Sequence, residues 1–380
     1  MIVANYRKLA TIDRTILIVA APIFILGLVD LLWYVLFKTR LAVYKNGYRG
    51  YLEAGKMMVA AFFSLLYLSR VAQREYKKIF LIVAVVGQCI LFGRAFYQSL
   101  YLGAERIPLS AMGGNINQMG AATVAAYMLT FCSLFAAIAI LKSQSKYRWI
   151  LFYGNFLLTL SAVVMTGTRA AIVTYPAMII LMVMIENRQH KKVMVKITAS
   201  LIGLLVVCGV LFRHDVNQRV DDMTQDISQY NNNNSDTSVG ARLAMVQAGF
   251  HSAPGIGWQS LETRAQKITE LSQHDPIYLG ALKYLDVHMH NEIIEAYSTK
   301  GISGVLFIAL FYLGMVFYCF KSKNYSLLVF PLAIFLFGLS DVITHAKPIP
   351  ASWIVGLLLS IVLCNEGARR TGTPHSTRAS

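Results

Sequence analysis

A histidine and an asparagine stand together where the long polar segment of this chain gives way to an apolar run. His290 and Asn291 close the polar residues 213–300, and Gly301-Ile302-Ser303-Gly304 follows nine residues later. An imidazole changes its charge near neutral pH, so it can take a proton from a hydroxyl group. His290 lies where a membrane helix would meet water, so we expect it to take part in acid–base chemistry on a partly lipidic substrate. We expect Asn291 to contact that substrate.

Arginines on the same side of the membrane predict phosphate binding. Arg169 lies in a tight turn between two apolar runs, and Arg242 opens an amphipathic helical pattern with Phe250 on its apolar side. Two guanidinium groups can hold a diphosphate and stabilise the charge that grows on it as a bond breaks. Arg94, within an apolar run, is a further candidate for substrate binding, although its side chain could simply reach the interface.

Membrane helices must position these residues. The chain is 56% hydrophobic and 14% charged, its mean hydropathy is +0.53, and a spanning helix needs about 20 apolar residues. The sequence therefore predicts an all-α polytopic membrane protein with about ten transmembrane helices and one large, partly helical loop. The ten apolar stretches are 15–37, 52–69, 79–101, 118–141, 149–166, 170–186, 195–212, 302–320, 326–344 and 350–364.

Lysine and arginine in the short connections indicate which helix ends face the cytoplasm. The connections after the second, fourth, sixth, eighth and tenth stretches are basic, so both termini are expected inside. The loop 213–300 then lies on the outer side, and it carries 7 basic and 11 acidic residues. The net charge of +16 therefore reflects membrane topology, and no nucleic-acid partner is needed to explain it.

One outer connection is unexpectedly basic. Lys38, Arg40, Lys45 and Arg49 lie between the first two apolar stretches, interleaved with tyrosines. We expect Lys38 and Arg40 to bind a negatively charged substrate group, such as a lipid head group or a phosphorylated saccharide. The alternative is a solvated basic loop without a ligand.

Several polar residues near His290 leave alternatives open. His288 and His290 could share a metal ion, but the sequence offers no evident third ligand, and we expect no metal. Asp286 or Glu292 could orient the His290 ring. The five cysteines match no zinc or disulfide pattern. The sequence also lacks a glycine-rich phosphate loop, so ATP use has no support and no cofactor is expected.

Other polar positions are less specific. Asp341 and His345, at the outer end of the ninth stretch, could line the same cavity or form a plain polar cap. Asp30 within the first stretch predicts a hydrogen bond between helices, and Asn117 could touch substrate or cap the fourth stretch. Residues 226–236, with four consecutive asparagines, predict a disordered connection.

The motifs resemble those of bacterial O-antigen ligases, within the O-antigen ligase/polymerase superfamily of membrane glycosyltransferases. They occur in the expected order, over residues from about 115 to 320. The match comprises a small-Gly-small-Arg turn, an outer-loop Arg element followed by Pro-Gly-x-Gly, and a His-Asn…Gly-x-x-Gly signature. In this chain they read Thr166-Gly167-Thr168-Arg169-Ala170, then Ser238-Val239-Gly240-Ala241-Arg242 with Pro254-Gly255-Ile256-Gly257-Trp258, and then His288-Met289-His290-Asn291 with Gly301-Ile302-Ser303-Gly304.

That resemblance implies a specific reaction. Such ligases transfer a polysaccharide from undecaprenyl pyrophosphate to lipid A-core, on the periplasmic face of the inner membrane, without metal or nucleotide. Carried over, His290 would be the general base, and Arg169 and Arg242 would bind the diphosphate. The Gly-x-x-Gly would let the eighth span start close against neighbouring backbone or lipid. Family members have up to twelve spans, so the expected count here is 10–12.

The expected organisation has four parts: an N-terminal transmembrane bundle (1–212), a periplasmic loop with catalytic residues (213–300), C-terminal transmembrane helices (301–364) and a disordered cytoplasmic tail (365–380). The expected partners are the undecaprenyl-pyrophosphate-linked glycan, lipid A-core and membrane lipids. An O-antigen polymerase, which joins lipid-linked repeat units, is the alternative. A protein oligosaccharyltransferase would usually have a longer chain, and a transporter would usually have repeated halves.

Overall fold

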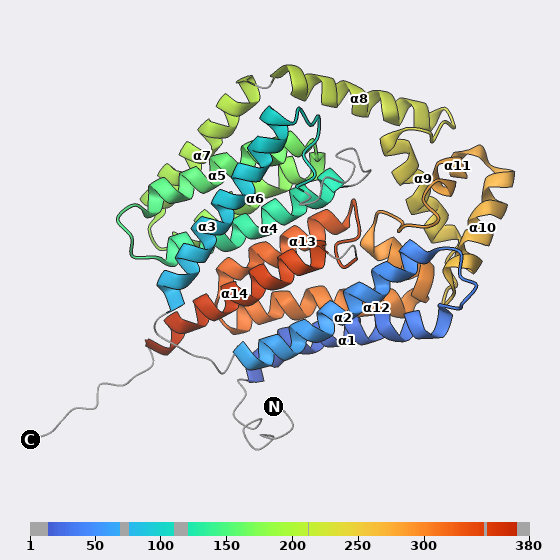
Figure 1. The fold of residues 1–380 in the computed structure, drawn as a ribbon, viewed down its shortest axis with the longest axis horizontal. Coiled ribbons are helices and arrows are strands. Elements are labelled where there is room, and N and C mark those ends of the chain that lie inside the picture. The colour runs from blue at the N-terminus through green and yellow to red at the C-terminus, as the bar shows by residue number, and fades with distance from the viewer. Residues whose placement is uncertain (1–13, 69–75, 110–120, 212, 346–347, 371–380) are drawn as a thin grey trace, which may run out of the picture.

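The computed structural model describes residues 14–68, 76–109, 121–211, 213–345 and 348–370, with fourteen α-helices and no β-strand among them (Figure 1). Nine of the ten predicted apolar stretches lie largely within one of these helices, and about half of the stretch 326–344 lies in the helix Val329–Gly338. The bounds of the ten helices concerned are α1 Arg14–Phe37, α2 Lys45–Leu68, α3 Tyr76–Phe96, α4 Ala121–Lys142, α5 Arg148–Thr166, α6 Arg169–Glu186, α7 Lys191–Leu211, α12 Glu292–Lys321, α13 Val329–Gly338 and α14 Pro348–Arg370.

Seven of the described helices are long and apolar enough to cross a membrane, which confirms the all-α polytopic class. They are α1, α3 with its π-helical extension Tyr97–Tyr101, α4, α5, α6, α7 and α12. The helices α13 and α14 are apolar but shorter, and α2 begins with charged residues. The count of ten spans therefore stays a prediction.

The bundle is built around α4, the most buried of these seven helices. It contacts α3, α5, α6, α13 and α14, and its many alanines let neighbouring backbones approach closely. The hairpin of α1 and α2 packs beside it, with α1 against α12 and α2 against α14. Two helices end at other residues than predicted. The stretch 326–344 was expected to be helical throughout, but α13 ends at Gly338, and α14 continues beyond the predicted residue 364 to Arg370.

The polar segment 213–300, predicted to lie outside and called the outer segment, is more helical than a loop. It contains α8 Arg213–Asn231, α9 Ser238–His251, α10 Leu261–His274, the 3₁₀ turn Pro276–Tyr278 and α11 Leu279–Leu282. In Figure 1, α9, α10 and α11 gather at one end of the bundle, and α8 joins them to the bundle along the top of the view. Thr237 and Ser260 begin α9 and α10 as N-caps, each accepting a hydrogen bond from a backbone N–H in the first turn.

Two expectations for this segment were wrong. Residues 226–231 belong to α8, and Ser235 is buried, where its hydroxyl accepts a hydrogen bond from the Gly280 N–H at 2.9 Å. The predicted disordered connection is thus a structured corner. Phe250 is 56% exposed, because the buried side of α9 is formed by Ala244, Met245 and Ala248. Asn117 and the last ten residues lie outside the described residues.

A kink divides α12 at the predicted Gly-x-x-Gly. Gly301 has φ +57° and ψ −152°, a conformation that glycine tolerates and other residues rarely adopt. A Cβ atom at Gly301 would lie 2.1 Å from the carbonyl oxygen of Gly255, which accepts a hydrogen bond from the Ile302 N–H at 2.8 Å. The expected close approach to neighbouring backbone is confirmed, and its partner is the Pro-Gly-x-Gly segment.

Candidate active site

Two histidines meet on one carboxylate at the end of the bundle where α12 begins, which was predicted to face outward and is called the outer end. The Nε2 atom of His288 lies 2.7 Å from Oδ1 of Asp341, and Nδ1 of His290 lies 3.2 Å from the same oxygen. An ionised carboxylate only accepts hydrogen bonds, so both ring nitrogens donate to it. In a neutral His290 ring, Nε2 then carries the lone pair, and no described residue is bonded to it.

The backbone of this segment is held by a buried ion pair. Arg264 and Glu295 are almost completely buried, with 2.8 Å between Nη1 and Oε2. Glu295 Oε2 also accepts a hydrogen bond from the Met289 N–H at 2.8 Å, and Arg264 donates to the carbonyl of Val287. The pair therefore fixes the chain on both sides of His288. This clamp was not recognised in the sequence, where Arg264 is one of many charged residues in an amphipathic helix.

Asn291 connects the histidine segment to the end of α13. Its side-chain oxygen accepts a hydrogen bond from the Ile294 N–H at 3.0 Å, which caps α12. Its side-chain nitrogen donates to the carbonyl of Leu339 at 3.1 Å. Asn291 was predicted to contact substrate, whereas both of these hydrogen bonds serve the structure of the protein. It brings the start of α12 within reach of Asp341.

Burial and hydrogen bonding shift the pKa values of the groups around this carboxylate. Burial alone would raise the pKa of Asp341, but hydrogen bonds from His288 and His290 hold that pKa far below its ordinary value. Burial alone would lower the pKa of His288, yet the hydrogen bond and negative charge of Asp341 outweigh it and raise that pKa. His288 and Asp341 thus form an ion pair. Burial lowers the pKa of the nearby His345 to about 3, so this ring is neutral.

The two predicted phosphate-binding arginines also lie at the outer end. The charges of Arg242 and Asp341 both act on the hydroxyl of Tyr127, near the start of α4. Arg169 begins α6, and the other end of α6 is anchored to the start of α13 through Glu186 and Ser326. Since α6 and α13 run in opposite directions, Arg169 lies toward the end of α13 that carries Asp341. Neither arginine is bonded to a described residue.

The remaining predicted binding residues lie farther from the histidines along the chain. Arg94 lies in the last turn of α3 with its guanidinium 5.8 Å from the centre of the Tyr97 ring. Lys38 donates to the carbonyl of Thr39, and Arg40 is exposed. No bond between described residues joins these three side chains to the histidines.

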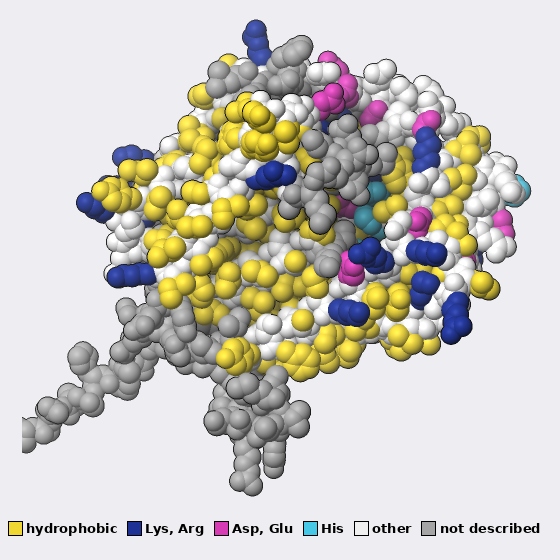
Figure 2. All heavy atoms as spheres, viewed as in Figure 1, with side chains coloured by type: hydrophobic (Ala, Val, Ile, Leu, Met, Phe, Trp, Pro, Cys, Tyr) yellow, Lys and Arg dark blue, Asp and Glu magenta, His cyan; other side chains and the backbone are white. Residues whose placement is uncertain are grey.

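The connection between α1 and α2 is bound partly by acidic residues of the outer segment. Glu262 accepts hydrogen bonds from the Val43 N–H and the Tyr48 hydroxyl, at 3.1 and 2.6 Å. Asp286 accepts two from Asn46, so the prediction that it orients His290 was wrong. In Figure 2, basic side chains gather over this corner, beside a hollow that contains histidine side chains.

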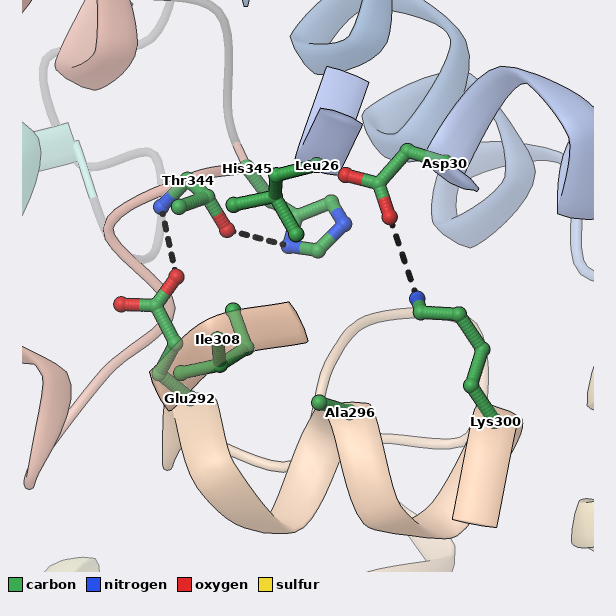
Figure 3. A pocket seen from close by; sticks show the side chains of 8 residues that line it. All are labelled: Leu26, Asp30, Glu292, Ala296, Lys300, Ile308, Thr344 and His345. Carbon is green, nitrogen blue, oxygen red and sulfur yellow. Dashed lines mark hydrogen bonds and ion pairs between the residues drawn. The ribbon is translucent and has the colours of Figure 1, made fainter. Parts of the chain in front are cut away.

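A small cavity is lined by residues of α1 and α12 and by Thr344 and His345 (Figure 3). It has room for one water molecule, about 10 Å³, and Asp30 and Lys300 form an ion pair of 3.1 Å at its edge. Asp30 therefore joins two helices, as expected, with a lysine as its partner. Glu292, the other residue predicted to orient His290, accepts hydrogen bonds from the Thr344 N–H and the Tyr312 hydroxyl instead.

Comparison with known proteins identifies the family. Residues 154–309 match the family model described as "O-Antigen ligase". The O-antigen ligase of Escherichia coli (strain K12) is 30% identical over 354 residues, which cover 92% of this chain and 82% of that protein. The chain belongs to the O-antigen ligase family. Membership implies a glycosyltransferase-type enzyme in a multi-pass membrane protein.

The range of the O-antigen ligase family model includes four predicted site residues, namely Arg169, Arg242, His290 and Asn291. Asp341 lies beyond the matched range. The sequence placed Asp341 at the outer end of an apolar stretch, but a polar cap was the simpler interpretation. Only the fold brings it against His290.

A metal ion remains a chemical alternative for this centre. The ligand atoms of His288, His290 and Asp341 lie within 4.8 Å of one another, so the third ligand that the sequence did not reveal is Asp341. An ion bound by all three would have to replace both histidine–aspartate hydrogen bonds, because both rings direct a nitrogen at one oxygen. The hydrogen-bonded arrangement instead suits a base and the group that orients it.

Proposed function

We propose that this protein transfers a polysaccharide from undecaprenyl pyrophosphate to a sugar hydroxyl of lipid A-core. The reaction would take place at the periplasmic side of the inner membrane, without a metal ion or nucleotide. One observation carries the proposal: the hydrogen bond of 3.2 Å between His290 Nδ1 and Asp341. It fixes the tautomer in which Nε2 can accept a proton, as expected of a general base.

The proposed step is a single displacement. The acceptor hydroxyl oxygen bonds to the anomeric carbon of the donor glycan, and the bond from that carbon to the diphosphate oxygen breaks. The hydroxyl proton passes to His290 Nε2, and the electron pair leaves with undecaprenyl pyrophosphate. Arg169 and Arg242 bind the diphosphate and stabilise its growing charge. Asp341 stabilises the imidazolium that forms.

The basic α1–α2 connection supports a phosphorylated acceptor. Arg40 and Lys45 are exposed and have no ion pair among the described residues, whereas Arg49, also exposed, pairs with Glu53 at 2.8 Å. Glu262 and Asp286 bind backbone N–H groups of this connection and do not pair with its cations. We propose that Lys38 and Arg40 bind a phosphate of the acceptor lipid there, and that Arg94 faces the donor lipid from α3.

The test is the lipopolysaccharide profile of cells that lack this protein, complemented with wild type or His290→Ala. We expect core-only lipopolysaccharide from His290→Ala, with full-length glycan accumulating on undecaprenyl pyrophosphate and normal levels of protein in the membrane. Single repeat units on the core would indicate the alternative, an O-antigen polymerase. An unchanged ladder in the deletion strain would refute both assignments, and normal transfer by His290→Ala would refute the base.

The diphosphate role has its own test. Arg169→Lys and Arg242→Lys keep the charge but lose the planar fork that binds two phosphate oxygens together. Each should reduce transfer strongly, and Arg148→Lys, the same change at an exposed arginine at the start of α5, should not. Full activity of both lysine variants would show that neither guanidinium is required.

A further inference from the structure

A polar cavity lies at the opposite end of the bundle from the histidines. Its volume is about 210 Å³, and its walls come from the ends of α4, α6 and α12 and the turn that precedes α13. The histidine segment precedes the first residue of α12, whereas Lys323 lies just beyond the last. The part of α12 after its kink at Gly301 runs from residue 302 to residue 321 and is roughly 30 Å long, about the thickness of the hydrocarbon core, so the two sites are at different membrane surfaces.

The charges around this cavity do not balance. Glu186 is the one acidic residue in its wall, and it is already bound by Lys142 at 3.0 Å and by the Ser326 hydroxyl. Arg188 and Lys323 have no ion pair with any described residue, and both are exposed. The cavity therefore presents two uncompensated positive charges.

The cavity also has an interfacial aromatic wall. The guanidinium of Arg188 lies 4.5 Å from the centre of the Tyr325 ring, which holds this cation at the rim by a cation–π interaction. Lys323 has φ +58° at a position after a helix end where glycine is favoured. Lysine therefore occupies a backbone position that would suit glycine better.

We propose that this cavity binds the phosphodiester head group of an anionic phospholipid, such as phosphatidylglycerol. Basic pockets between transmembrane helices on the cytoplasmic side recognise such head groups, and the basic connections place this end of the bundle there. Cations near helix C-termini also interact favourably with the helix dipoles, and this interaction accounts for Lys142 in the last turn of α4. It does not account for Arg188 and Lys323, which lie beyond their helices around an open polar cavity. This proposal does not depend on the transfer reaction.

The experiment compares lipid binding by the purified full-length protein and two charge variants. Arg188→Gln with Lys323→Gln removes the two free cations of the cavity. Lys191→Gln with Lys192→Gln is the matched control, because these residues are exposed at the start of α7 and outside the cavity wall. Binding of palmitoyl-oleoyl phosphatidylglycerol is measured by native mass spectrometry and by the rise in Tm. The zwitterionic phosphatidylethanolamine and inorganic phosphate are tested in parallel.

We expect phosphatidylglycerol to bind the cavity variant roughly 30-fold more weakly than wild type, which corresponds to two surface cations. The matched control should bind it normally, and all three proteins should have the same Tm without lipid. An equal loss of phosphatidylglycerol binding in both variants would show that net charge alone causes the effect, and it would overturn the proposal. Equal binding of phosphatidylethanolamine would overturn it too. Stabilisation by inorganic phosphate alone would mean a free-anion site in place of a lipid site.

Discussion

The two imidazoles on Asp341 have different chemical capacities. The bond to Asp341 raises the pKa of His288 and so favours its protonated form, and a protonated imidazole cannot act as a base. His290 has the longer bond to Asp341, and the Tyr284 ring packs edge-on against it at 5.6 Å. Its backbone has φ +46°, a conformation that costs free energy and is concentrated at functional sites. These features favour His290 as the proton acceptor and His288 as a positioning residue.

Asp341→Asn tests the orienting carboxylate. The amide has no charge with which to stabilise a protonated His290, so we expect glycan transfer to fall at least about 100-fold. The protein should still insert into the membrane. Asp236→Asn is the matched control, since Asp236 is exposed and pairs with Lys283, away from the histidines. Unchanged transfer by Asp341→Asn would remove Asp341 from the mechanism.

His288→Asn tests the positioning role through pH. Removing a positive charge beside Asp341 leaves the carboxylate free to stabilise protonated His290, so the acidic limb of the pH–rate profile should move to higher pH. Stability should change as well. The folded pKa of His288 is raised, so the ion pair stabilises the protein fully below the unfolded histidine pKa of about 6.5. That contribution is lost as the pH rises through the folded value.

The measurement for His288→Asn is the Tm of wild type and variant across pH, together with the rate profile. The difference in Tm should be largest in acid and shrink as the pH rises. A difference that does not depend on pH would mean that His288 acts by packing alone. An acidic limb that stays in place would show that its charge does not reach His290.

At the scale of elements, the site depends on how α12 begins and where it bends. The clamp of Arg264 and Glu295 fixes the chain before α12, and Asn291 caps the helix. Breaking such a buried pair by removing one partner typically costs about 3–5 kcal/mol. Nine residues after its start, α12 bends at Gly301 against Gly255. Between the cap and the bend lie Glu292, Glu295 and Lys300, which connect the outer segment to α1 and to the α13 connection.

Gly301→Ala tests the bend. The new Cβ would meet the Gly255 carbonyl oxygen at 2.1 Å, and the positive φ would be strained as well, so the loss of stability should exceed about 1 kcal/mol. Tm and transfer should fall together, because the same segment carries the histidines. Gly154→Ala is the control, since a Cβ there meets nothing within 4 Å, and its Tm should be unchanged or higher. An unchanged Tm for Gly301→Ala would mean that the close approach is dispensable.

At the scale of the whole molecule, the sequence predicted what local patterns encode. Run lengths of apolar residues predicted the helices, and the motif order predicted the family. The sequence left Asp341 open between a cavity residue and a polar cap, and it did not reveal the Arg264–Glu295 clamp. These contacts join residues 51 and 31 positions apart, which no local pattern records. The prediction of disorder at the asparagine-rich residues 231–234 was wrong for a related reason. Their composition is typical of disorder, but packing around the distant-contact residue Ser235 holds this corner in place.

The orientation of the whole bundle can be tested with introduced cysteines. Lys146→Cys lies in the connection between α4 and α5 and Gln266→Cys lies on α10, and both positions are exposed. The five native cysteines lie in apolar helices, so wild type is the background control for a membrane-impermeant maleimide. In spheroplasts we expect labelling of Gln266→Cys alone, and of Lys146→Cys only after the membrane is permeabilised. The α9–α11 region and the histidines share one end of the bundle, so labelling of Lys146→Cys in intact spheroplasts would place the candidate active site on the cytoplasmic side, where no periplasmic transfer could occur.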